Sequence, residues 1–90
     1  MYDLKTADPV QEEVCALLRD TLNLTGRAAE LTAETGLFGS LPEFDSMAVV
    51  AVLTALEERF GIVIEDDEID AAIFRTVGSL TDFVRRKRAD

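Results

Sequence analysis

Ser46 is the hydroxyl whose setting first suggests chemistry, because it follows Asp45 where an irregular stretch gives way to a strongly periodic one. Aspartate often begins helices, since its carboxylate accepts hydrogen bonds from backbone amides of the first turn. Ser46 is therefore expected in the first turn of a helix. A serine after an aspartate at a helix start usually reflects capping alone, so this pair by itself indicates no more than a helix start.

Histidine and cysteine, the side chains that most often act as catalytic bases, nucleophiles and zinc ligands, are scarce. The sequence contains no histidine and a single cysteine, Cys15. Catalysis of the Cys/His and Ser/His/Asp types is excluded because both need a histidine base, and zinc sites lose their best ligands. One cysteine forms no intramolecular disulfide. Cys15 stands among Val14, Leu17 and Leu18 on an apolar helix face, where we expect a buried, unreactive thiol.

Two long segments have the apolar spacing of amphipathic helices. The first has Asp8 as its predicted cap and Pro9 at the first helical position, and it fades at 23–26. The second covers 45–60 and ends at Gly61. Its predicted inward residues are Val49, Val52, Leu53, Leu56 and Phe60.

Residues 25–45, between these helices, have no regular period. They carry apolar side chains at intervals, namely Leu31, Leu37, Phe38 and Leu41. An ordered loop of this length is uncommon and usually functional. We expect its apolar side chains to hold it on the core, so that it brings position 45 to a fixed place.

After Gly61, the chain is predicted to form a short helix and a final long one. The acids at 65–68 suit the start of a short helix that includes Ile69, Ala72 and Ile73. Thr76 caps the last helix, which buries Val77, Leu80, Phe83 and Val84 and ends in the basic run 85–88. The predicted fold class is all-α: a small four-helix bundle, with three main helices plus one short helix, and a long first loop.

Length and charge limit the classes of protein that remain. The 90 residues fit a single domain, 1–90, with its core at about 8–84. The net charge is -9, and it is -12 over residues 1–84. Such a surface repels nucleic acid and attracts proteins with positive patches. No stretch approaches the ~20 apolar residues of a membrane span, and the first residues lack the pattern of a secretory signal. We therefore expect a cytoplasmic monomer.

Two charged runs have alternative interpretations. The acidic run at 65–70 could be interpreted as a calcium site. It lacks the alternating ligands and the glycine of an EF-hand loop, so we favour a solvated helix start instead. The basic run at 85–88 would suit an anionic membrane, yet such charges more often serve the helix end and solubility. Neither run is assigned a metal or membrane function.

Several motifs taken together resemble the acyl carrier protein family. Phe44-Asp45-Ser46-Met47 resembles its Asp-Ser-Leu signature. Three further stretches resemble, in this order, the end of a carrier helix, the acidic segment and the entry to the last helix: Leu56 to Ile62, Asp66-Asp67-Glu68, and Phe74 to Val77. The resemblance covers about 8–84. Agreement among size, charge, helical pattern, loop and motifs outweighs the interpretation of Asp45-Ser46 as capping alone.

The resemblance implies a carrier of acyl groups and not an enzyme. In this family a phosphopantetheinyl transferase moves 4'-phosphopantetheine from coenzyme A to the serine hydroxyl, and the thiol of this arm carries acyl groups as thioesters. By position the serine is Ser46, with Asp45 as motif residue and helix cap, and amides of a first helical turn favour an attached phosphodiester. The partners implied are enzymes of fatty-acid, polyketide or related lipid biosynthesis. Because 41–64 resembles carriers that work with acyl-adenylate ligases, such a ligase is an expected partner.

The chain departs from the family pattern beside Ser46. Met47 replaces the usual leucine, a change that conserves volume. Ala48 and Ala51 stand on the expected solvent face, where many carriers of fatty-acid synthesis have acids that dock on basic enzymes. We interpret this as an apolar docking face for dedicated enzymes, with plain helix propensity as an equally weighted alternative. The predicted partner-binding residues are Met47, Ala48, Ala51, Glu57, Glu58, Asp66, Asp67 and Glu68.

The alternative function is a small acidic helical adaptor that binds a basic protein surface without covalent modification. Size and charge fit both functions. Covalent modification of Ser46 discriminates between them.

Overall fold

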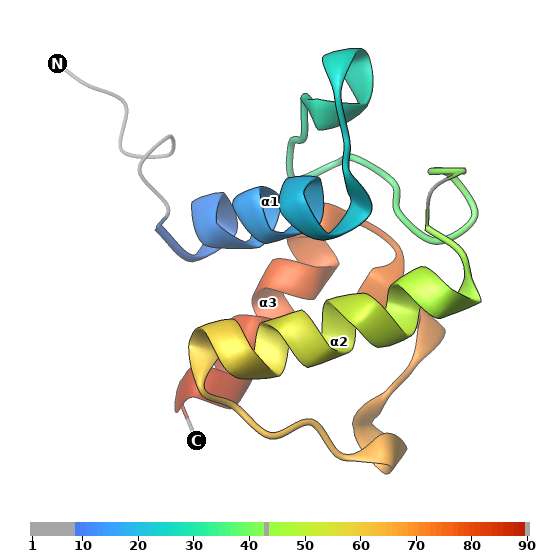
Figure 1. Ribbon diagram of the computed structural model, residues 1–90. Coiled ribbons are helices and arrows are strands. Elements are labelled where there is room, and N and C mark those ends of the chain that lie inside the picture. The colour runs from blue at the N-terminus through green and yellow to red at the C-terminus, as the bar shows by residue number, and fades with distance from the viewer. Residues whose placement is uncertain (1–8, 43, 90) are drawn as a thin grey trace, which may run out of the picture.

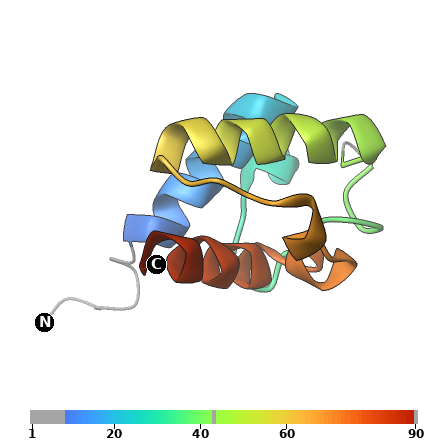
Figure 2. The ribbon, with the colours of Figure 1, turned by 90° about the horizontal axis from the view of Figure 1, so that it is seen from below.

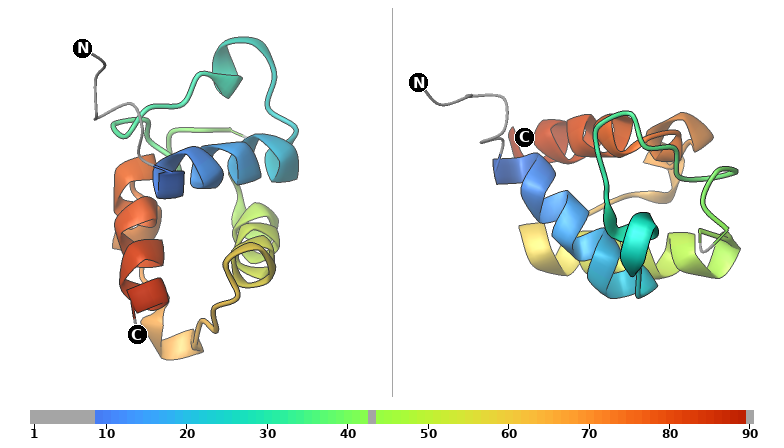
Figure 3. Two further views of the ribbon diagram at one scale, coloured as in Figure 1. Left: turned by 90° about the vertical axis from the view of Figure 1, so that its left-hand side faces the viewer. Right: turned by 90° about the horizontal axis from the view of Figure 1, so that it is seen from above.

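The computed structural model describes residues 9–42 and 44–89, which form three α-helices, α1 (Pro9–Leu22), α2 (Ser46–Phe60) and α3 (Val77–Ala89). Three 3-10 turns, η2 (Gly26–Ala29), η3 (Asp66–Glu68) and η4 (Ala71–Phe74), lie in the connections, and the described residues contain no strand. α1 packs against both α2 and α3 (Figure 1). The left view of Figure 3 shows α1 lying across the other two helices. The predicted all-α class is confirmed.

Apolar side chains from all three α-helices form the core. In α2 the predicted stripe faces inward, with Val52 and Leu56 fully buried and the remaining members partly buried. In α1 and α3 the buried apolar residues are Val14, Cys15, Leu17, Leu18, Val77, Leu80, Phe83 and Val84. These include every residue predicted to face inward from the last helix. None of the described helices is both long enough and apolar enough to cross a membrane.

The boundaries predicted for the three long helices lie close to the observed ones where they fall in the described residues. The predicted cap Asp8 lies outside those residues. α2 ends at Gly61, which has the left-handed φ of 63° and donates its N–H to Glu57 O. Glycine adopts this conformation readily because it has no Cβ. α3 begins with a reciprocal capping box, in which Ser79 N donates to Thr76 Oγ1 at 3.1 Å and Thr76 N donates to Ser79 Oγ at 3.0 Å.

The loop between α1 and α2 is fastened to the start of α3. Leu37 N donates to Arg75 O at 3.0 Å, and Gly36 and Thr76 form an isolated antiparallel bridge. The apolar residues predicted to hold the loop divide into three groups: Leu37 is fully buried, Leu31 and Leu41 are partly buried, and Phe38 is half exposed. The loop therefore packs on the core as expected, although the Phe38 ring stays largely outside it.

The short helix predicted after 65–68 is instead two 3-10 turns. Ile69 separates them with extended backbone, φ -78° and ψ 122°. Asp70 then begins η4, because its carboxylate accepts a hydrogen bond from Ala72 N at 2.8 Å. A short polar side chain that bonds to nearby backbone in this way competes with continuous helix, so the segment turns twice.

Candidate functional site

Ser46 is exposed and is the first residue of α2. Directly before it, Asp45 has extended backbone, and its Oδ1 accepts a hydrogen bond from Ala48 N at 2.9 Å. The Asp45 main-chain oxygen accepts from Val49 N at 3.0 Å. Because Asp45 performs the capping, the Ser46 hydroxyl is not required for it.

The amides at the start of α2 favour a negative charge. Within the described part of the chain, no group accepts a hydrogen bond from the N–H of Ser46 or Met47. The first turn contains no acidic side chain. Helix-start amides that no described residue pairs, together with the helix dipole, make this place favourable for a phosphate.

Aromatic packing fixes the backbone that leads into Ser46. Phe44 is buried, and its ring centroid lies 5.6 Å from that of Phe74 and 6.2 Å from that of Phe38. The Phe44 amide also donates to Leu41 O at 3.0 Å. Sequence reasoning used Phe44 only as part of the motif and missed this supporting role, which depends on contacts with residues distant in sequence.

The α2 surface beside Ser46 is apolar. Met47 is 81% exposed, Val50 is also largely exposed, and Ala51 is exposed. Ala48 does not stand on the solvent face as predicted: it is half-buried and packs against the core. Sequence reasoning did not single out Val50, although its spacing of four residues from Ser46 places both on one helix face.

The acids expected to meet partners differ in their surroundings. Glu58, Asp66 and Asp67 are exposed. By contrast, Glu57 is half-buried and its Oε2 accepts a hydrogen bond from Ile64 N at 2.8 Å, while Glu68 is half-buried and paired with Lys87. Only the first three therefore present freely solvated carboxylates to an approaching protein.

Cys15 is buried, as predicted, and its thiol is free. Burial raises the pKa of its thiol, with the nearby Arg19 acting in the opposite direction. A thiol with a raised pKa holds little thiolate at neutral pH and reacts slowly. In the part of the chain that the structure describes, no three His, Cys, Asp or Glu side chains form a group that could hold a metal ion.

Known proteins with a similar sequence and fold carry a covalent group. The family model of the phosphopantetheine attachment site matches residues 12–84. The solution NMR structure of a holo acyl carrier protein from Nitrosomonas europaea is 51% identical, covers 89% of this chain and 96% of that chain, and superposes with a TM-score of 0.80. The chain belongs to the acyl carrier protein family. Among curated proteins, none matches this sequence.

As an acyl carrier protein, the chain is a carrier and not a catalyst, and it takes a covalently attached 4'-phosphopantetheine. These matches do not favour the alternative of an unmodified adaptor. The start of α2 fits the group, since it combines an exposed hydroxyl, amides that no described residue pairs, and a first turn without acids. When attached, the group supplies a terminal thiol that carries acyl groups as thioesters.

Proposed function

We propose that Ser46 is the attachment residue and that a phosphopantetheinyl transferase delivers the arm to it from coenzyme A. The observation that carries this proposal is an exposed hydroxyl in the first turn of α2, directly after a cap formed by another residue. The other described serines lack this setting. Ser40 is exposed but lies in a loop turn, and the partly buried Ser79 Oγ donates to Ile73 O at 2.8 Å.

Mass spectrometry of serine variants tests the assignment. The full chain is incubated with coenzyme A and a promiscuous phosphopantetheinyl transferase, and its intact mass is measured before and after. We expect the wild-type protein and Ser40→Ala to gain one phosphopantetheinyl group, and Ser46→Ala to gain none. A modified peptide from Ser46→Ala that maps to another hydroxyl would overturn the assignment.

We further propose that the enzymes that load and unload the carrier dock on the apolar face formed by Met47, Val50 and Ala51. This face is supported by its exposure and its position beside Ser46. Exposed aliphatic side chains favour shape-specific contact over charge pairing. The exposed Glu58, Asp66 and Asp67 would steer basic partner surfaces toward it through long-range attraction.

The cargo class follows from the family, and its pathway is our proposal. We propose that the protein works in the cytoplasm and delivers acyl thioesters to dedicated enzymes of fatty-acid, polyketide or related lipid biosynthesis, with an acyl-adenylate ligase as loading enzyme. The apolar face supports dedicated partners, since general fatty-acid enzymes dock on acids at this place. Reconstituted loading of the phosphopantetheinylated protein by the ligase and by a malonyl transferase tests this, and faster loading by the malonyl transferase would contradict it.

A further inference from the structure

The segment that joins α2 to η4, residues 62–70, is weakly packed. None of the residues of η3 is buried, and Val63 and Ile69 are exposed. Its apolar anchors are Ile62, which is buried, and Ile64, which is partly buried, and both lie close to the end of α2. Figure 2 shows a single length of backbone extending from the end of α2 toward η4. We call residues 62–70 the crossover.

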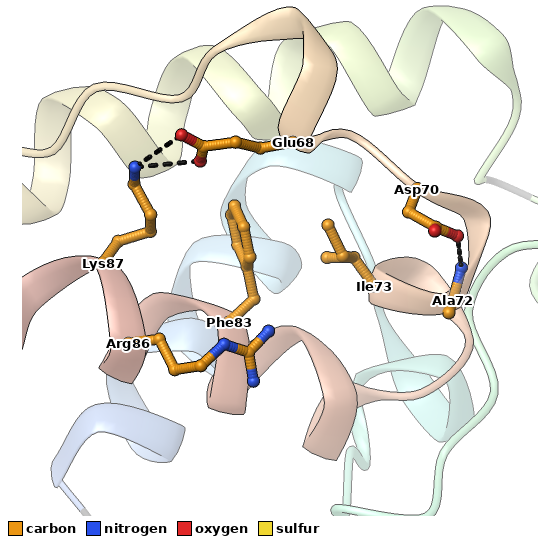
Figure 4. Close-up of a pocket in the computed structure, with 7 residues that line it drawn as sticks. All are labelled: Glu68, Asp70, Ala72, Ile73, Phe83, Arg86 and Lys87. Carbon is orange, nitrogen blue, oxygen red and sulfur yellow. Dashed lines mark hydrogen bonds and ion pairs between the residues drawn. The ribbon is translucent and has the colours of Figure 1, made fainter.

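Open hollows lie on both sides of the crossover. One of about 270 Å³ lies against α2, and its lining includes Val50, Leu53 and Ile69. Another of about 530 Å³ lies against α3, where Ile73 and Phe83 line it (Figure 4). Because neither side of residues 65–70 is tightly filled, this part of the crossover can shift while Ile62 and Ile64 keep their places on the core.

One ion pair ties the far end of the crossover to α3. Lys87 Nζ lies 2.9 Å from both carboxylate oxygens of Glu68 and donates its hydrogen bond to Oε2 (Figure 4). The two side chains are only 18% and 30% exposed, respectively. Oε1 is buried and accepts no hydrogen bond from any described residue, so the ionic contact with Lys87 is what compensates its burial. Loss of Lys87 would leave this oxygen uncompensated unless the crossover moved it into water.

We propose that the Glu68–Lys87 ion pair is a latch that holds the crossover closed on α3, and that its release opens the crossover while the three α-helices remain folded. At the α2 end, Ile64 N donates to Glu57 Oε2 at 2.8 Å and Ile62 N donates to Glu57 O at 3.2 Å, so this end would stay in place when the crossover opens. Opening would change the hollow against α2, which Val50 lines one turn after Ser46. The ion pair formed by Lys87 near the end of α3 would thereby influence the shape of the α2 surface beside Ser46.

Amide hydrogen exchange measured by NMR on the full unmodified chain tests the latch. Lys87→Met removes the ammonium group but keeps an apolar stem of similar length, and Glu68→Gln removes the opposite charge while leaving Lys87 in place. In both variants we expect the amides at positions 68 and 69 to exchange about fivefold faster relative to their intrinsic rates, as for loss of one ion pair. Exchange at Val52 and Leu56, in the middle of α2, should keep its wild-type rate.

Arg86→Met is the matched control, because it removes one positive charge from the adjacent residue. Arg86 lines the same hollow, and Figure 4 joins it to none of the residues drawn. We expect wild-type exchange in this control, and we expect the reversed pair Glu68→Lys with Lys87→Glu to slow exchange again relative to Lys87→Met. Wild-type exchange in both Lys87→Met and Glu68→Gln would overturn the latch. So would equal acceleration across the crossover and α2, which would indicate general destabilisation.

Discussion

The Phe44 ring lies 5.6 Å from the Phe74 ring, so the backbone that enters α2 is held by the residue that ends η4. Truncation of the buried Phe44 should open a cavity and lower the free energy of unfolding by about 3–5 kcal/mol. Urea denaturation of Phe44→Ala measures this. Phe38→Ala is the control. Because Phe38 is half exposed, its truncation removes less buried apolar surface and should lower the free energy of unfolding by less. An equal loss in both variants would contradict the anchoring role of Phe44.

Asp45 should stabilise the start of α2 through its hydrogen bond with Ala48 N. Asp45→Ala removes the acceptor and should cost about 1 kcal/mol of unfolding free energy. Asp45→Asn keeps an acceptor oxygen in the same place and should cost much less. Thermal and urea denaturation of the two variants compare these costs. If Asn proved as damaging as Ala, the charge of Asp45 and not its capping would be responsible.

Gly61→Ala should destabilise the protein by about 1 kcal/mol through backbone conformation alone. Gly61 has a φ of 63°, and a Cβ built on it would meet nothing within 4 Å. The cost therefore comes from placing an L side chain in the left-handed region and not from a clash. Gly61→Asn should lose less unfolding free energy than Gly61→Ala, since asparagine tolerates the left-handed region better than alanine does. Equal urea midpoints for wild-type protein and Gly61→Ala would refute the explanation.

Ala51→Glu should redirect partner choice with little effect on stability, because Ala51 is exposed on α2. This prediction rests on the proposed function. At low salt, a malonyl transferase of general fatty-acid synthesis should load Ala51→Glu faster than wild-type protein. High salt should remove this difference, because charges at the rim of an interface act mainly on the encounter rate and are screened by salt. Initial loading rates of the phosphopantetheinylated protein measure this.

The control for partner choice is Ala51→Gln, which adds a similar volume without charge. Ala48 is unsuitable for the same test because it packs against the core. Equal initial rates for wild-type protein and both Ala51 variants at every salt concentration would show that this face does not select the partner.

Moderate sodium chloride should raise the melting temperature. Residues 1–84 carry a net charge of -12, and Glu65, Asp66, Asp67 and Asp70 lie exposed near one another in sequence. Salt screens their repulsion in the compact state. The double variant Asp66→Asn with Asp67→Asn should melt higher than wild type at low salt and respond less to added salt. Melting temperatures that stay flat with salt would contradict the repulsion argument.

Helices were predictable from local patterns, and the connections between them were predictable only in part. The stripe of α2, its stop at Gly61 and the cap of α3 each depend on residues close in sequence, so periodicity and capping rules locate them. The prediction of one short helix after 65–68 was wrong, because the Asp70 carboxylate accepts a hydrogen bond from Ala72 N and the segment forms two separate turns. Ala48 was assigned to the wrong environment because it packs against the core, and an alanine in a helix gives no sequence signal of which face it occupies.

The sequence by itself determined the all-α class, the helix that begins after Asp45, and the absence of histidine-dependent catalysis, because these follow from composition and from interactions within a few residues. Tertiary structure decided which polar groups remain available to other molecules. Glu57 and Glu58 are adjacent and chemically alike, yet the Glu57 carboxylate accepts a hydrogen bond from Ile64 N while Glu58 is exposed to solvent. Likewise Glu68 meets Lys87 from 19 residues away. Such pairings depend on how the helices pack, since only packing brings distant segments within hydrogen-bond reach.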